Sequence, residues 1–238
     1  NISPNIQCGL FSLEERQVDP QQLVKALRSV AIQFPIKVLE NVKITDIVAN
    51  NGLEINVQIE NGRSQIMSFD TLTIASGAWS AQVAEIFGFS LPIKPIKGQI
   101  VSLKPATPLI NHVVFGKDCY LVPRQDGRVI VGATVEDVGF DETVSDSSND
   151  ALLDLASRFL CGITKSDMID SWTGLRPASA DGLPLLGLLP GLSNVFVATG
   201  HYRNGILLAP ITGKLIRDAI LQRPNDSVLL QFSPARFI

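Results

Sequence analysis

Hydrophobic and polar positions follow two different periods along this chain. Near the start, apolar side chains recur every three to four residues, at Leu23, Leu27, Val30 and Phe34. This spacing predicts an amphipathic helix over residues 20–33. Asp19 and Pro20 are suited to begin it, and Pro35 is suited to end it.

A period of two replaces the helical period further along. Short strands are expected over 36–39 and 42–48, and strict alternation marks residues 53–59, at Leu53, Ile55, Val57 and Ile59. Turn residues at 50–52 and at 61–62 predict hairpins between strands. We therefore expect a small antiparallel meander that ends near Phe69.

Two compact apolar runs, 71–75 and 195–199, predict buried strands, and each is followed by a glycine and a helical pattern. The second junction contains a polar loop over 200–205. A helix that begins after such a loop presents free N–H groups and a positive dipole end, which suits a negatively charged ligand. The alternative is an ordinary turn in which the glycines only reverse the chain. Pro210 predicts that the regular helix begins between 206 and 210.

Residues 91–177 have a different character, because prolines and Asp-Gly turns separate their short apolar segments. This pattern predicts a mostly antiparallel sheet covered by one helix at about 149–160. A strand is also expected within residues 1–15. The whole chain therefore predicts a mixed α+β and α/β fold, with part of a nucleotide-binding domain beside an antiparallel-sheet domain.

Composition narrows the choice of partners and compartment. The net charge of −3 and the pI of about 5.4 argue against nucleic acid or an anionic membrane. No apolar run is long enough for a membrane span. Cys8, Cys119 and Cys161 lack metal-ligand spacing, as do the two histidines, so we expect reduced thiols, no metal and a cytoplasmic protein.

Three motifs carry a family resemblance over nearly the whole chain. They are GLRP at 174–177, DGLP at 181–184 and HYRNGILLAP at 201–210. Together they resemble the C-terminal signature of the D-amino acid oxidase group of FAD-dependent flavoenzymes, and most of all the glycine oxidases of thiamine biosynthesis.

The resemblance implies a domain organisation. Residues 1–15 would be a substrate-domain strand, 16–90 and 178–225 parts of the FAD-binding domain, 91–177 the substrate domain and 226–238 a tail. The family begins with a G-x-G-x-x-G turn that holds the FAD pyrophosphate, and this sequence contains none. We therefore expect a C-terminal portion, with on the order of a hundred residues or more outside it.

Arg176 is the first candidate for substrate binding. Its planar guanidinium group can bind a carboxylate through two parallel hydrogen bonds, although an internal salt bridge is the alternative. The resemblance implies that Arg176 binds the substrate carboxylate, that Tyr120 donates to the same group, and that Arg203 adds positive charge beside the reacting centre. A sheet tyrosine with a satisfied hydroxyl is the alternative for Tyr120. The resemblance also places Val135 against the substrate.

The same resemblance implies a set of cofactor-binding residues: Val42, Gly77, His201, Tyr202, Arg203, Asn204, Gly205, Ile206 and Leu207. Backbone N–H groups of 204–207 would stabilise negative charge on the flavin. We do not expect His201 to be a general base, because hydride transfer from an amine requires only a neutral, well-oriented amine.

The implied activity is oxidation of glycine, or of another small amino acid or amine, to its imine, with FAD as cofactor and oxygen reduced to hydrogen peroxide. A sarcosine oxidase and a D-amino acid dehydrogenase are the neighbouring alternatives. A non-catalytic fragment that binds carboxylates is the alternative from another class. A homo-oligomer is compatible with the sequence.

Overall fold

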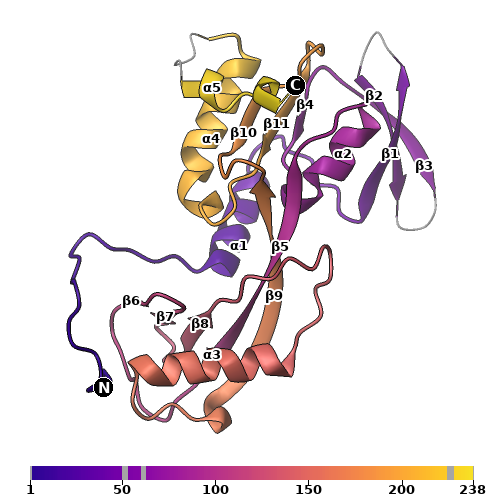
Figure 1. Ribbon diagram of the computed structural model, residues 1–238. Coiled ribbons are helices and arrows are strands. Elements are labelled where there is room, and N and C mark those ends of the chain that lie inside the picture. Colours follow the sequence, from indigo (N-terminus) through magenta and orange to yellow (C-terminus); the bar gives the residue numbers. More distant parts are fainter. Residues whose placement is uncertain (1, 50–52, 60–62, 224–227, 238) are drawn as a thin grey trace. The chain divides into compact units, whose positions relative to one another are not determined.

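The computed structural model describes residues 2–49, 53–59, 63–223 and 228–237. The chain divides into two compact units, each formed by two stretches of sequence. Unit 1 contains Asn1–Asp19 and Ile96–Leu175, and unit 2 contains Pro20–Pro95 and Arg176–Ile238. Figure 1 shows their helices and strands.

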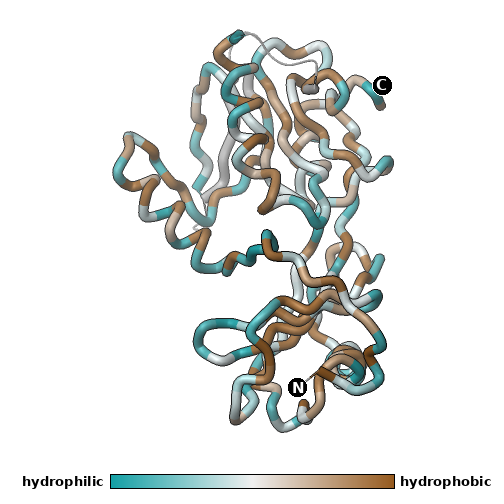
Figure 2. The backbone as a smooth tube through the Cα atoms, turned by 90° about the vertical axis from the view of Figure 1, so that its left-hand side faces the viewer, coloured by the Kyte–Doolittle hydropathy of each residue, from teal (hydrophilic) through white to brown (hydrophobic). Residues whose placement is uncertain are grey.

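Unit 1 is built on a five-stranded sheet in the order β6-β7-β8-β5-β9. The strands are β5 (Ile93–Leu103), β6 (Val114–Phe115), β7 (Tyr120–Pro123), β8 (Val129–Gly132) and β9 (Met168–Ser179). The pairs β6–β7, β7–β8 and β8–β5 are antiparallel, as the sequence predicts. In Figure 2, long hydrophobic stretches gather in the part of the tube near the N-terminus.

Helix α3 (Asp146–Phe159) covers this sheet and closes its core. Leu152, Leu153 and Ala156 of the helix are buried with Val101, Leu121 and Val131 of the strands. The helix begins three residues before the predicted 149, because the Ser145 hydroxyl caps it by accepting a hydrogen bond from the Ser148 N–H. The short 3-10 helix η2 (Lys165–Asp167) leads into β9.

The strand expected within residues 1–15 is not formed by residues 2–15, which the structure describes. Ile2 makes one isolated bridge to Leu160, and the Ser3 N–H donates to the Phe159 carbonyl at 2.8 Å. The side chains of residues 4–15 are exposed, so no neighbouring strand fixes an extended conformation there.

Unit 2 contains two three-stranded sheets. The first has the order β10-β11-β4, in which β11 (Val195–Thr199) pairs antiparallel with β10 (Leu185–Leu188) and parallel with β4 (Leu72–Ile74). The 3-10 helix η1 (Gly77–Trp79) and helix α2 (Ser80–Ile86) follow β4, and helix α4 (Gly205–Ile220) follows β11. Buried apolar residues of this core include Ile74, Ala84, Leu185, Val195 and Val197.

The second sheet is the predicted meander of β1 (Val42–Ala49), β2 (Leu53–Ile59) and β3 (Ser64–Phe69), and both of its pairs are antiparallel. The two predicted turns at 50–52 and 61–62 lie outside the described residues. Residues 36–39 form no strand. Helix α1 (Pro20–Ala31) precedes the meander, and α5 (Val228–Gln231) and the 3-10 helix η3 (Pro234–Phe237) end the described chain.

Candidate functional site

Two parallel strands of unit 2 end at the same edge of their sheet, and each is followed by a glycine with positive φ. Ile74 of β4 pairs with Val197 of β11, so both strands leave the sheet in one direction. Gly77 has φ +57° and Gly200 has φ +78°. The Thr199 hydroxyl donates a 3.0 Å hydrogen bond to the Gly77 carbonyl and joins the two turns. In open α/β sheets, ligands bind at this edge.

The two glycines serve different purposes. A Cβ on Gly200 would lie 3.2 Å from side-chain atoms of Ile93 and Leu185, so this position requires glycine for packing as well as for φ. A Cβ on Gly77 would meet no atom within 4 Å. The backbone of Gly77 therefore has open space beside it, and a ligand can approach this peptide closely.

The loop that follows β11 is held against the end of β9. The Tyr202 N–H donates to the Pro177 carbonyl at 3.0 Å, and His201 forms an antiparallel bridge with Ala178. Tyr202 has φ +50°, a conformation that a bulky residue adopts only where its surroundings impose it. Arg176, the residue before Pro177, therefore belongs to the segment that lies beside this loop.

His201 joins the loop to helix α4. Its Nε2 atom lies 2.9 Å from the Thr212 hydroxyl. Burial lowers the pKa of the imidazole below its usual value, so the ring is neutral at pH 7. Sequence reasoning missed Thr212, because no motif or spacing distinguishes a hydroxyl that bonds back to a loop from any other threonine in a helix.

Helix α4 begins with unpaired backbone donors. The N-cap residue Asn204 makes no side-chain capping bond, and its own N–H donates to the His201 carbonyl at 2.9 Å. Asn204 is therefore not among the free donors. In the described part of the chain, no acceptor pairs with the N–H groups of 205–207. These three groups, at the positive end of the helix dipole, can bind a negatively charged or electron-rich ligand.

Helix α4 begins one residue before the predicted range of 206–210. The helix begins at Gly205, so Pro210 is its sixth residue and lies inside it. Proline has no N–H to donate to the carbonyl of Ile206, one turn earlier. The helix ends at Ile220, and Pro224 lies outside the described residues.

The two arginines predicted to bind the substrate differ in their surroundings. Arg176 is half-buried in β9 and interacts with other groups of the protein. Arg203 is exposed, and no hydrogen bond or ion pair links it to another residue that the structure describes. The hydrogen bond from Tyr202 to Pro177 brings the segments that carry these arginines together.

Tyr120 and Val135 belong to unit 1, and both lie near Gly132. Tyr120 pairs with Gly132 across β7 and β8, and its ring and hydroxyl fill the space that a Cβ on Gly132 would need. The Tyr120 hydroxyl makes no hydrogen bond to another described residue, so it is available to a ligand. Val135, three residues after Gly132, is 59% exposed.

Val42 begins β1, where its backbone pairs with Ile59. Its side chain packs against the apolar core of unit 2. The packing accounts for an apolar residue at this position, and the predicted approach of its backbone to the adenine stays a prediction.

The described ranges contain no group of three His, Cys, Asp or Glu residues that could hold a metal ion, and no helix in them could cross a membrane. The thiols of Cys8, Cys119 and Cys161 are free, and burial raises the pKa of Cys119.

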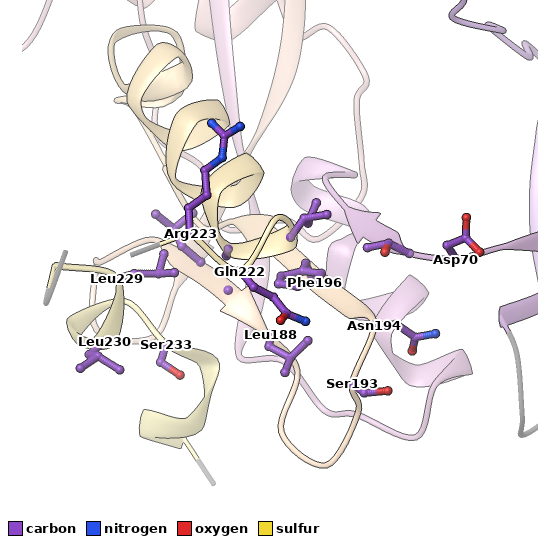
Figure 3. A pocket seen from close by; sticks show the side chains of 15 residues that line it. Asp70, Leu188, Ser193, Asn194, Phe196, Gln222, Arg223, Leu229, Leu230 and Ser233 are labelled. Atoms are coloured by element: carbon purple, nitrogen blue, oxygen red, sulfur yellow. The ribbon is translucent and has the colours of Figure 1, made fainter. Parts of the chain in front are cut away.

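A cavity of about 560 Å³ lies at the other edge of the β10-β11-β4 sheet (Figure 3). It is lined where β4 and β11 begin and where α4 ends, by residues that include Asp70, Asn194, Phe196, Gln222 and Leu229. None of the predicted site residues lines it. The cavity is therefore separate from the glycine-bracketed loop, which follows the opposite ends of these strands.

Comparisons with known proteins agree with the resemblance in the motifs. A family model described as FAD dependent oxidoreductase matches residues 1–219. A bifunctional protein ThiO/ThiG of Synechocystis is 38% identical over 236 residues, which are 97% of this chain and 34% of that protein. The hydrogen cyanide synthase subunit HcnC of Pseudomonas protegens is 31% identical over 238 residues, which are 100% of this chain and 57% of that subunit.

The fold is also similar to that of a solved glycine oxidase. The crystal structure of glycine oxidase from Geobacillus kaustophilus matches with a TM-score of 0.76 and 37% identity, covering 83% of this chain and 52% of that chain. The present chain thus spans between 34% and 57% of the length of these three relatives.

Proposed function

Because this chain belongs to the family of FAD-dependent oxidoreductases, we propose that it carries the substrate residues and part of the flavin site of an amino acid oxidase. The proposed substrate is glycine or another small amino acid or amine, which is oxidised to the imine while oxygen is reduced to hydrogen peroxide. Relatives named glycine oxidase and ThiO/ThiG support this substrate class and a place in thiamine (thiazole) biosynthesis.

The main support for this proposal is the loop between β11 and α4. Free N–H groups at the start of α4 and open space beside Gly77 fit an electron-rich ring system at this edge of the sheet. When bound, FAD supplies two-electron redox chemistry, because its ring accepts a hydride from carbon and passes the electrons to oxygen. The N–H groups of Gly205, Ile206 and Leu207 would hold negative charge at that ring without any movement of the backbone.

Substrate orientation is the proposed task of the polar side chains. Arg176 would bind the carboxylate through two parallel hydrogen bonds, and Tyr120 would donate a further one from its free hydroxyl. A small amino acid offers few other groups, so these contacts fix the direction of its Cα–H bond. Arg203 would add positive potential that favours the bound carboxylate.

No side chain is needed to remove the Cα proton, because the hydrogen leaves carbon together with its bonding electrons. The pKa of His201 fits this assignment, since the neutral ring is engaged with Thr212. We therefore assign His201 to fixing the loop and not to proton transfer.

An assay of the holoenzyme tests this function. With glycine as substrate, we expect oxygen consumption and an equal amount of hydrogen peroxide. Acetate, which keeps the carboxylate but has no amine, is expected to compete with glycine. An enzyme that oxidises propylamine as well as glycine would contradict a site built around the carboxylate.

A D-amino acid dehydrogenase is the second candidate, and the similarity to the hydrogen cyanide synthase subunit HcnC shows that relatives of this chain have names other than glycine oxidase. Such an enzyme would oxidise the same small amino acid but pass the electrons to an acceptor other than oxygen. Glycine-dependent reduction of an artificial electron acceptor, with no hydrogen peroxide formed in air, would identify it. Activity with sarcosine above that with glycine would indicate a sarcosine oxidase instead.

A further inference from the structure

The turn between β7 and β8 carries two arginines that lie opposite each other. Pro123 pairs with Val129 at the end of this hairpin. The Arg124 N–H continues the ladder with a 2.7 Å hydrogen bond to the Arg128 carbonyl. Residues opposite each other in an antiparallel pair place their side chains on the same face, where like charges repel. Two arginines at these positions therefore reduce stability unless negative charge lies between them.

In the described part of the chain, one carboxylate pairs with these two arginines, and it is bound by Arg128. Arg128 donates to the Asp126 carboxylate from Nε at 2.7 Å and from its backbone N–H at 3.1 Å. These bonds lower the pKa of Asp126 below its usual value, so it is ionised at pH 7. Lys104 adds a third cation, because its Nζ donates to the Asp126 carbonyl. The turn and Lys104 thus carry three cations and one carboxylate, in a chain whose net charge is −3.

The guanidinium group of Arg124 has neutral partners and an unpaired edge. Its Nη1 donates to Gln17 Oε1 and to the Val18 carbonyl, both at 3.2 Å. Gln17 is fixed in turn, because its Nε2 donates to the Pro123 carbonyl at 2.8 Å. Among the described residues, no acceptor pairs with Nε or Nη2 of Arg124. These two atoms form an edge that is held in place and can donate two parallel hydrogen bonds to one anion.

A cavity of about 270 Å³ lies beside both arginines. It is lined by Arg124, Gln125 and Arg128 of the turn, by the apolar segment 108–110 and by Asn111. The side-chain amides of Gln125 and Asn111 make no hydrogen bond to another described residue, so both can donate to a ligand. All the lining residues belong to unit 1, and none of the predicted site residues is among them.

We propose that this cavity binds the terminal phosphate group of a small phosphorylated molecule. The phosphate oxygens would accept two parallel hydrogen bonds from Nε and Nη2 of Arg124, and further ones from Arg128 and Asn111. A terminal phosphate carries nearly two negative charges, which match the excess of positive charge at the turn and relieve the repulsion between the arginines. The apolar segment 108–110 leaves room for a small organic group attached to the phosphate. The site lies within unit 1 and requires neither flavin nor amine, so it is independent of the proposed function.

Calorimetric titration of the 238-residue chain tests the proposal, with phenyl phosphate, inorganic phosphate and benzoate as ligands. Phenyl phosphate is expected to bind most tightly, because it combines a terminal phosphate with an apolar ring. Inorganic phosphate lacks the ring, and benzoate carries a single negative charge. We expect each of these two to bind about tenfold more weakly than phenyl phosphate. Added NaCl should weaken the binding of all three, because the arginines are partly exposed.

Substitution of Arg124 tests the contacts. Arg124→Gln removes the charge and the unpaired edge, so it is expected to weaken binding of phenyl phosphate by about tenfold or more. Arg124→Lys keeps the charge without the two parallel donors and should recover part of the affinity. Arg28→Gln is the matched control, because it removes an arginine from an exposed ion pair with Glu40 and should leave the affinity unchanged. In NMR spectra of the arginine Nε–H groups, phenyl phosphate should shift the signal of Arg124 and not that of Arg28.

Three results would overturn the proposal. The first is the absence of any binding of phenyl phosphate to the unsubstituted chain at about 10 mM ligand. The second is equal affinity of Arg124→Gln and Arg28→Gln for phenyl phosphate. The third is binding of benzoate as tight as that of phenyl phosphate, which would show that the phosphate is not recognised. If Arg124→Gln does not fold, as judged by circular dichroism, Arg128→Gln replaces it and must weaken binding as well.

Discussion

Arg176 stands one residue before Pro177, whose carbonyl holds the loop that follows β11. For the holoenzyme, we expect Arg176→Ala to lower kcat/KM for glycine, because the substrate carboxylate loses a charge-assisted pair. The expected loss of transition-state stabilisation is about 2–5 kcal/mol. Arg176→Lys keeps the charge but not the planar geometry, so it should recover only part. Steady-state kinetics with glycine and with propylamine, together with flavin content, measure the effect. An equal loss for both amines would identify Arg176 as a structural ion-pair partner.

His201 makes the stability of unit 2 depend on pH. Burial lowers its folded pKa below the unfolded value of 6.5. The neutral ring therefore favours the folded state above pH 6.5, and this contribution is lost as the pH falls through the folded pKa. We expect urea unfolding to show a loss of stability between pH 7.5 and 5.5 that is smaller in His201→Gln. His112→Gln is the control, and an equal change in both variants would contradict the assignment.

At the scale of elements, the junction of β11 with α4 depends on Gly200. Gly200→Ala would place a Cβ 3.2 Å from two side chains at φ +78°, so we expect a loss of more than about 1 kcal/mol in unfolding free energy. Gly213→Ala is the matched control, since it lies inside α4 with nothing within 4 Å of its Cβ. That change should stabilise the helix by about 0.5–1 kcal/mol. Chemical denaturation of both variants measures the difference, and similar losses would contradict it.

The last 3-10 helix, η3, is held to the turn before β10 by one ion pair. Arg236 donates to Asp181 at 2.8 and 3.1 Å and also to the carbonyls of Phe232, Ser233 and Leu183. The hydrogen bond from Arg236 lowers the pKa of Asp181 to about 2. The stabilisation is present above the unfolded value of 3.8 and is lost as the pH falls toward about 2.

We therefore expect Asp181→Asn to lower stability by about 1 kcal/mol at pH 7, allowing for partial exposure of the pair. The difference from the unsubstituted chain should shrink as the pH falls from 5 to 2, because the carboxyl group loses its charge there. Thermal unfolding at several pH values measures this. Asp150→Asn, in an exposed ion pair, is the control and should change little. A difference that does not depend on pH would contradict the role of the charge.

The sequence predicts those elements whose signal is local. β4, β11 and α4 each have a continuous apolar run or a helical period of their own, and the structure forms all three. β10 was missed, because its four residues become a strand only by pairing with β11. The hydrogen bonds from Thr199 to Gly77 and from His201 to Thr212 were missed for the same reason, since they join residues that only the fold brings together.

At the scale of the whole molecule, the chain matches the family model but is shorter than its relatives. The family model matches residues 1–219, yet the chain spans only 34% to 57% of the length of the three relatives described above. Helix α1 has no buried residue, and its apolar Val24 and Leu27 are 64% and 60% exposed. The chain also contains no G-x-G-x-x-G turn. The described residues therefore include unpaired N–H donors at the start of α4, which we propose for the flavin ring, but no glycine-rich turn for a pyrophosphate.

The presence of these donors without a glycine-rich turn predicts how the 238-residue chain by itself interacts with flavins. We assign the N–H groups at the start of α4 and the open backbone at Gly77 to the flavin ring, whereas tight binding of FAD also requires donors for its pyrophosphate. We therefore expect FAD and riboflavin to bind with similar, weak affinity. Flavin fluorescence titrations of both ligands measure this, with intact glycine oxidase from Geobacillus kaustophilus as the positive control. A preference for FAD of more than about tenfold would place pyrophosphate donors within these residues and contradict the prediction.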